Sequence, residues 1–245
     1  MKFADIILIH IKFFLSLIVF GLLFIIMDAG SFLINLFLPD TPFRRCLGRK
    51  WLAIMSGAGV RYLIKSKLFT CDFDEIEKIK KEKDLIIISN HPSRMDGMIL
   101  ASLLPNAIAV TKSSIWKRYA MGMTLRTAGY LEIKPLNKLF PEIQRSFDES
   151  AQLLLFPEGT RSKPGEKTGT FQGGFAIIAQ RTGKPVQPVI IESASPYLSQ
   201  GWPFYKLPPV PMVFKARLGP RLEAPERGPG NVTSLVRTAE RIFTS

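Results

Sequence analysis

The stretch Leu85-Ile86-Ile87-Ile88-Ser89-Asn90-His91-Pro92 decides the fold of this chain. Its first five residues are a short apolar run, which is typical of a strand buried on both faces of a sheet. A second run of this kind, Leu153–Phe156, also leads directly into a turn, Pro157-Glu158-Gly159. Ligands of α/β sheets bind beyond the carboxyl ends of the strands. The two turns therefore mark the expected position of a functional site.

Short apolar runs alternate with helical patterns along the rest of the chain. Besides 85–89 and 153–156, we expect strands at 60–65, 68–73, 107–111, 130–133, 186–191 and 213–218. Thr41-Pro42 has the form of a helix cap and first helical position, and Gly57 and Gly59 are expected to end that helix. Further helices are expected at 74–83, 93–104, 114–127, 137–150, 174–182 and 231–243. The alternation predicts an α/β fold, a mostly parallel or mixed sheet flanked by helices.

Residues 1–40 are the most apolar part of the chain, and we expect them to be a helical membrane anchor ahead of a domain at 41–245. Residues 6–27 are long enough to cross the hydrocarbon core as one helix. Alternatively, two helices fold at Asp28-Ala29-Gly30 and embed in one leaflet as a hairpin. The sequence leaves both forms open.

The net charge of +13 lies entirely after residue 40, because the first forty residues hold two lysines against three aspartates. A basic body behind an apolar segment suits anionic lipid headgroups. No nucleic-acid recognition motif accompanies the charge, so nucleic acid is not an expected partner. The basic residues at 44, 45, 49 and 50 place the domain on the cytoplasmic face of a membrane, which we take to be a bacterial inner membrane. Residues 195–211, rich in proline and aromatic residues, are expected to form a long loop, either a lid or a second membrane contact.

His91 and Asp96 are the candidate catalytic residues. A histidine can take the proton of an alcohol at neutral pH, and a carboxylate at its other ring nitrogen fixes the tautomer. Five positions on a helix differ by about 140°, so the two side chains meet only if His91 is still in the loop and Asp96 lies in the first turns of the helix. Since the other histidine, His10, lies in the apolar segment, we expect no metal site.

The remaining candidates are substrate-binding residues. Glu158 could bind a free hydroxyl of an acceptor, and Arg161 could bind a phosphate with two hydrogen bonds. Lys112 follows the strand 107–111 and would add positive charge to a phosphate pocket, unless it is an ordinary solvated lysine. Ser93 is either a substrate-binding residue or a polar residue at the helix start.

These motifs resemble the lysophospholipid acyltransferase family, whose best-known members are 1-acylglycerol-3-phosphate acyltransferases. Residues 90–96 fit the family pattern NHxSxxD, and residues 156–162 fit FPEGTRS without exception. Residues 129–134 and 186–190 correspond more weakly to the second and fourth blocks of the family. The resemblance covers roughly residues 85–192.

The resemblance implies transfer of an acyl chain from a thioester of acyl carrier protein or coenzyme A to a lysophospholipid hydroxyl, with no covalent acyl-enzyme and no further cofactor. His91 would be the general base and Asp96 its orienting partner. The residues that would position the acceptor are Glu158, Gly159, Thr160 and Arg161. The expected product is phosphatidate from lysophosphatidate.

Two departures from the family pattern bear on the acceptor: Glu132-Ile133-Lys134 in the second block, and Gln172 in place of a common lysine. They concern contacts to the acceptor and do not affect catalysis by the His91–Asp96 pair. Two alternatives to acylation of lysophosphatidate stay open. The chain could acylate a different lyso-lipid, such as an aminolipid or glycolipid precursor, or it could be a catalytically silent membrane-binding protein of the same fold.

Overall fold

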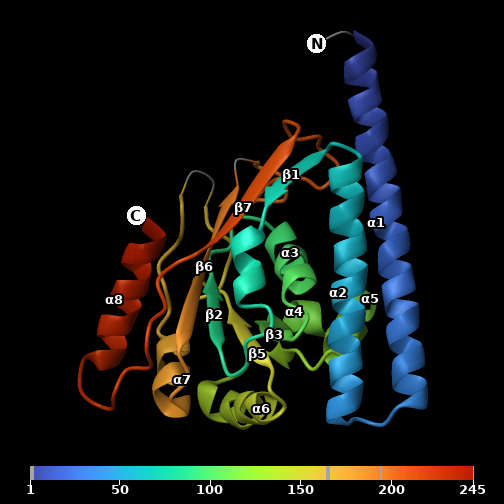
Figure 1. Cartoon of the computed structure of the whole chain (residues 1–245). Coiled ribbons are helices and arrows are strands. Elements are labelled where there is room, and N and C mark those ends of the chain that lie inside the picture. The colour runs from blue at the N-terminus through green and yellow to red at the C-terminus, as the bar shows by residue number, and fades with distance from the viewer. Residues whose placement is uncertain (1–2, 164–165, 194, 245) are drawn as a thin grey trace.

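A seven-stranded sheet runs through the centre of the molecule (Figure 1). The computed structural model describes residues 3–163, 166–193 and 195–244. The strands are β1 (Phe69–Asp72), β2 (Ile86–Ser89), β3 (Ala107–Thr111), β4 (Leu131–Glu132), β5 (Gln152–Leu155), β6 (Val186–Ser193) and β7 (Met212–Leu218). Their order across the sheet is β1-β7-β6-β2-β5-β3-β4. All neighbours pair in parallel except β6 and β7, so the predicted mixed sheet is confirmed.

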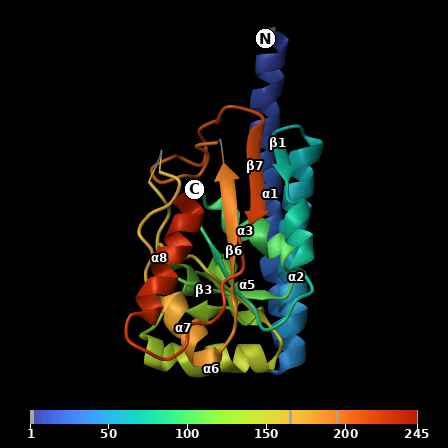
Figure 2. The same cartoon turned by 60° about the vertical axis from the view of Figure 1, so that its left-hand side comes forward.

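Helices cover both faces of this sheet. They are α1 (Phe3–Phe37), α2 (Pro42–Lys65), the 3₁₀ helix η1 (Asp74–Lys78), α3 (Met95–Leu103), α4 (Ser113–Trp116), α5 (Tyr119–Thr127), α6 (Leu136–Asp148), α7 (Gly174–Thr182) and α8 (Asn231–Thr244). Figures 1 and 2 show α3, α2 and α1 on one side and α7 and α8 on the other. The α/β architecture expected from the alternation of runs is therefore present.

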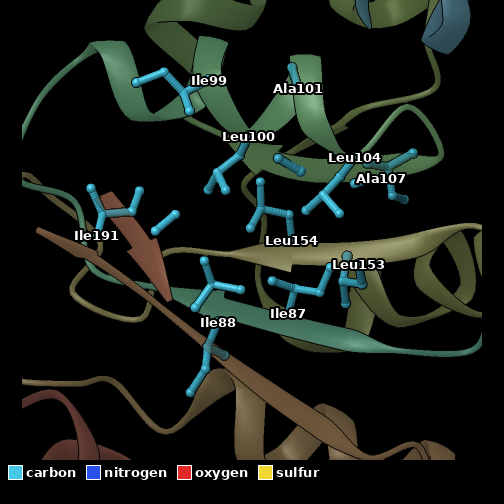
Figure 3. Packing of buried hydrophobic residues seen from close by; sticks show 14 of the residues in the cluster. Ile87, Ile88, Ile99, Leu100, Ala101, Leu104, Ala107, Leu153, Leu154 and Ile191 are labelled. Atoms are coloured by element: carbon cyan, nitrogen blue, oxygen red, sulfur yellow. The ribbon is translucent and has the colours of Figure 1, made fainter. Parts of the chain in front are cut away.

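Buried apolar residues pack on both faces of the central strands. Ile87 and Ile88 of β2 and Leu153 and Leu154 of β5 are almost completely buried, and Leu100 of α3 points toward these strands (Figure 3). Burying one such side chain contributes about 1.5–3 kcal/mol. The apolar runs therefore fix β2 and β5 as the middle of the sheet, and their carboxyl ends carry the two motifs.

The N-terminal segment is one helix, and it continues through Asp28-Ala29-Gly30 without the turn that a hairpin at that point needs. Among the described residues, α1 is the one helix long and apolar enough to cross a membrane. Exposed apolar side chains occur along its whole length, from Phe3 to Phe37. The helical membrane anchor is therefore a single helix, while the division of the chain at residue 40 stays a prediction.

The second half of α1 packs against the rest of the protein. The carboxylate of Asp28 accepts hydrogen bonds from Met121 N at 3.0 Å and Thr124 Oγ1 at 2.8 Å in α5. The Ser31 hydroxyl donates to Thr124 Oγ1 at 2.9 Å, and Trp51 Nε1 of α2 donates to Met27 O at 2.9 Å. Polar groups of α1 are thus paired with α2 and α5.

The predicted strand at 60–65 is wrong, because α2 continues through Gly57 and Gly59 to Lys65. A Cβ at position 59 would lie 2.7 Å from the Phe20 ring of α1. Gly59 therefore allows α1 and α2 to approach each other closely, and it does not end the helix. The expected start of α2 is confirmed, since Thr41 Oγ1 accepts a hydrogen bond from Arg44 N at 3.3 Å.

Other boundaries differ in smaller ways. The helix expected at 114–127 is divided into α4 and α5, and the helix expected at 74–83 is only η1. Two of the basic residues after α1 are buried within the protein. Arg45 forms ion pairs with Asp40 and Glu149, each at 2.5 Å, and Arg49 is also buried. The ion pair of Arg45 with Glu149 links the start of α2 to the end of α6.

Candidate active site

The His91–Asp96 pair lies at the carboxyl end of β2. His91 is in the loop, and Asp96 is in the first turn of α3, which begins at Met95. His91 Nδ1 is 3.1 Å from Asp96 Oδ2. The expected geometry is confirmed, and the catalytic roles of the two residues stay predictions. When Nδ1 carries the hydrogen and donates it to Asp96, Nε2 is left as the basic nitrogen.

The Asp96 carboxyl is fully buried, whereas the His91 side chain keeps 22% of its surface exposed. Burial raises the pKa of Asp96 above its ordinary value, although the hydrogen bonds from His91 and from Ser93 N oppose this shift. The Ser93 N–H donates to Oδ2 at 2.7 Å, and Oδ1 has no hydrogen-bond partner among the described residues. The Asp96 carboxyl therefore contacts His91 through Oδ2. Of the two side chains, only that of His91 is accessible from solvent.

Three neighbours hold the His91 loop in place. The His91 ring stacks on Phe156 with centroids 4.3 Å apart. The Asn90 side chain bridges to β6, because Ile191 N donates to Oδ1 at 2.7 Å and Nδ2 donates to Ile191 O at 2.9 Å. Ser162 N donates to His91 O at 3.0 Å. The two motifs, more than sixty residues apart in the chain, thus form one hydrogen-bonded unit.

Glu158 occupies the centre of this unit. Its carboxylate accepts hydrogen bonds from His91 N at 2.9 Å, Ser162 Oγ at 2.8 Å and Gly169 N at 2.7 Å. The side chain is only 6% exposed. A carboxylate has about four acceptor positions, and three donors of the protein are already bound to this one. The geometry therefore favours a role in holding His91, and binding of an acceptor hydroxyl by Glu158 stays a prediction.

Ser93 forms a hydrogen bond with the first residue of α3. Its hydroxyl accepts a hydrogen bond from Met95 N at 3.1 Å and donates to Tyr197 O at 2.8 Å, and the residue is fully buried. Of the two interpretations of Ser93, the structure supports the polar residue at the helix start. It gives no support to substrate binding by this side chain.

Arg161 lies beside the pair but contacts the loop at 195–211. Its Nη1 donates to Leu198 O at 2.9 Å and to Ser199 O at 2.7 Å. Burial, and then the positive charge of nearby Arg94, lower the pKa of Arg161, while Asp96 opposes this shift. Two guanidinium groups close to each other, one of them close enough to Asp96 for its charge to act on it, favour an anionic ligand at this position.

The remaining candidates lie at the surface of the same edge. Gly159 has a φ of +65°, which favours glycine in this turn, and both Gly159 and Thr160 are exposed. Lys112 is exposed after β3, and in the part of the chain that the structure describes it makes no ion pair. Lys134, where the family pattern differs, pairs with Glu142 of α6 at 2.9 Å. The structure does not bring Lys112 into the hydrogen-bonded unit.

Sequence reasoning missed several residues of the site, among them Phe156, Ser162 and Tyr197. The first two lie inside the FPEGTRS motif, so their position was visible but their role was not. Tyr197 has no motif around it. It is found only because Ser93 donates to its carbonyl oxygen and because its ring lies 5.7 Å from the ring of Phe13 in α1.

Comparisons with known proteins identify the family of this chain. The family model described as Acyltransferase matches residues 71–192. A 1-acyl-sn-glycerol-3-phosphate acyltransferase of Pseudomonas aeruginosa is 26% identical over 241 residues, which covers 89% of this chain and 86% of the relative. An enzyme of the same name from Helicobacter pylori is 31% identical over 112 residues, 43% of this chain and 47% of the relative.

A solved structure shares the fold. The 1-acyl-sn-glycerophosphate acyltransferase PlsC from Thermotoga maritima superposes with a TM-score of 0.72 at 18% identity, over 100% of this chain and 95% of that chain. The family match contains both motifs, and the first relative extends the similarity over most of the chain. The chain is therefore an acyltransferase and belongs to the same family as the 1-acyl-sn-glycerol-3-phosphate acyltransferases.

Proposed function

We propose that this enzyme acylates the free hydroxyl of lysophosphatidate to give phosphatidate, with an acyl thioester of acyl carrier protein or coenzyme A as donor and no other cofactor. The observation that carries the proposal is the His91–Asp96 pair, 3.1 Å apart at the carboxyl edge of the sheet, in which only the histidine is exposed. The relatives named as 1-acyl-sn-glycerol-3-phosphate acyltransferases support this acceptor.

The reaction follows from the chemistry of that pair. Nε2 of His91 takes the proton of the acceptor hydroxyl as its oxygen attacks the thioester carbonyl carbon. The new C–O bond forms, the C–S bond breaks, and the thiolate of the carrier takes the proton back from the imidazolium. Asp96 holds the ring through Nδ1 and stabilises its positive charge while the proton is on Nε2.

The phosphate of the acceptor would bind beside the two guanidinium groups. Arg94 is exposed and Arg161 is half-buried, and a guanidinium group matches the geometry of a phosphate with two hydrogen bonds. With its phosphate bound there, the acceptor would present its free hydroxyl to His91. Lys112, exposed after β3, would add a further positive charge for this phosphate.

The enzyme works at a membrane through α1, and we propose that its site faces the cytoplasm. Lysophosphatidate and phosphatidate both remain in the bilayer, so an anchored enzyme need not extract either lipid. Anionic headgroups would attract this basic protein, since the net charge of the whole chain is +13.

The test is acyl transfer in isolated membranes that contain the full-length protein. With labelled lysophosphatidate and acyl thioester, the wild type forms phosphatidate, and we expect His91→Ala to lose about 10² to 10⁴ of the rate. His10→Ala is the matched control, because His10 is the other histidine of the chain and lies in α1. Equal rates for His91→Ala and the wild type would refute the assigned base. Product from a different lyso-lipid alone would refute the acceptor.

A further inference from the structure

The loop at 195–211 is fixed to the candidate active site at its base. It leaves the carboxyl end of β6, which is parallel to β2, so it lies at the same edge of the sheet as His91. Ser93 Oγ donates to Tyr197 O at 2.8 Å, and Arg94 N donates to Leu198 O at 3.2 Å. Figures 1 and 2 show this segment crossing the end of the molecule beyond which α1 projects.

The outer part of the loop presents two aromatic rings to solvent. Phe204 and Tyr205 are each 61% exposed, and their ring centroids are 5.5 Å apart. Behind them, the Tyr197 hydroxyl donates to Phe204 O at 3.0 Å. The Trp202 indole donates to Lys206 O at 3.0 Å, and Lys206 Nζ lies 4.5 Å from the centroid of the Trp202 ring. The exposed pair is therefore held in place by contacts within the loop.

The same loop packs on α1. Phe13, the first buried residue of α1, is only 1% exposed and makes an edge contact with the Tyr197 ring. Residues 3–12 extend beyond this contact by about 15 Å. Their exposed apolar side chains include Ile6, Ile7 and Ile11. A bilayer that takes up this part of α1 has its surface near the level of Phe13, and hence near Tyr197.

We propose that Phe204 and Tyr205 enter the interface of the bilayer that holds α1 and form a second membrane contact beside the active site. Tyrosine and tryptophan are enriched at this depth, because one part of each ring system is apolar and the other can hydrogen-bond. Lys206 adds a positive charge for anionic headgroups. The contact would hold the edge with His91 against the lipid surface. The proposal rests on attachment through α1 and not on the identity of the acceptor.

Quenching of tryptophan fluorescence by brominated lipids tests this contact. The full-length variants Phe204→Trp and Phe43→Trp are placed in vesicles of phosphatidylcholine and phosphatidylglycerol, with and without brominated acyl chains. Phe43 is the matched control, since it is 68% exposed and lies at the start of α2, at the opposite end of α1. We expect the emission added at position 204 to be quenched more than that added at 43. Quenching at 204 that does not exceed quenching at 43 would overturn the proposal.

A kinetic measurement distinguishes contact of Phe204 and Tyr205 with a bilayer from contact with a protein partner. For Phe204→Ser combined with Tyr205→Ser, we expect roughly a tenfold lower rate with acceptor in vesicles, because membrane binding scales with buried apolar area. The rate with a short-chain, water-soluble acceptor should be unchanged. The loss should be equal with acyl-carrier-protein and coenzyme A thioesters. A loss confined to the carrier-protein donor would show that the pair binds that protein, and would overturn the membrane contact.

Discussion

The two motifs of this enzyme use their charged groups in opposite ways. In the first, Asp96 is buried so that His91 can act at a partly open surface. In the second, the Glu158 carboxylate is enclosed by donors of the protein, two of them backbone N–H groups. In the proposed mechanism, one motif supplies the reacting group, and the other supplies the frame that holds it. The contacts of Glu158 with His91 N and Gly169 N favour a positioning role for this signature residue.

Asp96→Asn tests the first motif and should have the largest effect. The variant keeps the shape of the side chain but loses the charge that stabilises the imidazolium. We expect acyl transfer to fall by about 10² to 10⁴, as in other histidine–carboxylate pairs. Initial rates in membranes measure this loss, with Asp72→Asn, an exposed carboxylate of β1, as control. A rate within twofold of the wild type would remove Asp96 from the mechanism.

Glu158→Ala tests the second motif and should have a smaller effect on the rate. Three donors lose their partner, and each buried donor left unpaired destabilises the fold by about 1–3 kcal/mol. If Glu158 positions His91, kcat falls while KM for the acceptor changes little. If Glu158 binds the acceptor, KM rises instead. Glu158→Gln should recover part of the rate, and Glu166→Gln, an exposed glutamate nearby, should behave as the wild type.

The smallest effect concerns the pH dependence of stability. Burial raises the pKa of the Asp96 carboxyl, so the folded protein keeps a proton that the unfolded chain has already lost. Wild-type stability therefore declines as pH rises from about 3.8 toward the raised pKa, with a slope of at most about 1.4 kcal/mol per pH unit.

Asp96→Asn lacks this titration. Denaturant unfolding in detergent between pH 4 and 7 should thus show the wild type losing stability relative to the variant as pH rises. A difference in unfolding free energy that stays constant over this range would mean that burial of Asp96 carries no such penalty.

Much of the fold follows from short patterns. The apolar runs at 85–89 and 153–156 locate β2 and β5, and because parallel strands end at one edge, the two motifs were expected to meet. Pro92 and the preceding strand keep His91 out of α3, which makes the pairing with Asp96 predictable. These features depend on local sequence and on the rule that neighbouring parallel strands end at the same edge of a sheet.

Other features depend on contacts between distant parts of the chain. Val60 to Ile64 has the composition of a strand, yet it is helical because α2 packs along α1, with Gly59 against Phe20. The role of Glu158 depends on where the backbone N–H groups of His91 and Gly169 point, and a pattern of side chains carries no such information. Residues 195–211 were expected to be a lid or a membrane contact, and their link to Ser93 became visible only in three dimensions.

The hydrogen bonds between the second half of α1 and α5 have a practical consequence for solubilisation. Truncation to residues 41–245 would remove Asp28 and Ser31, and would leave Met121 N and the Trp51 indole without the acceptors they have now. Deletion of residues 1–12 alone would keep these hydrogen bonds. Polar replacements of the exposed apolar side chains of α1 after residue 12 would then offer the better route to a water-soluble enzyme with its site intact.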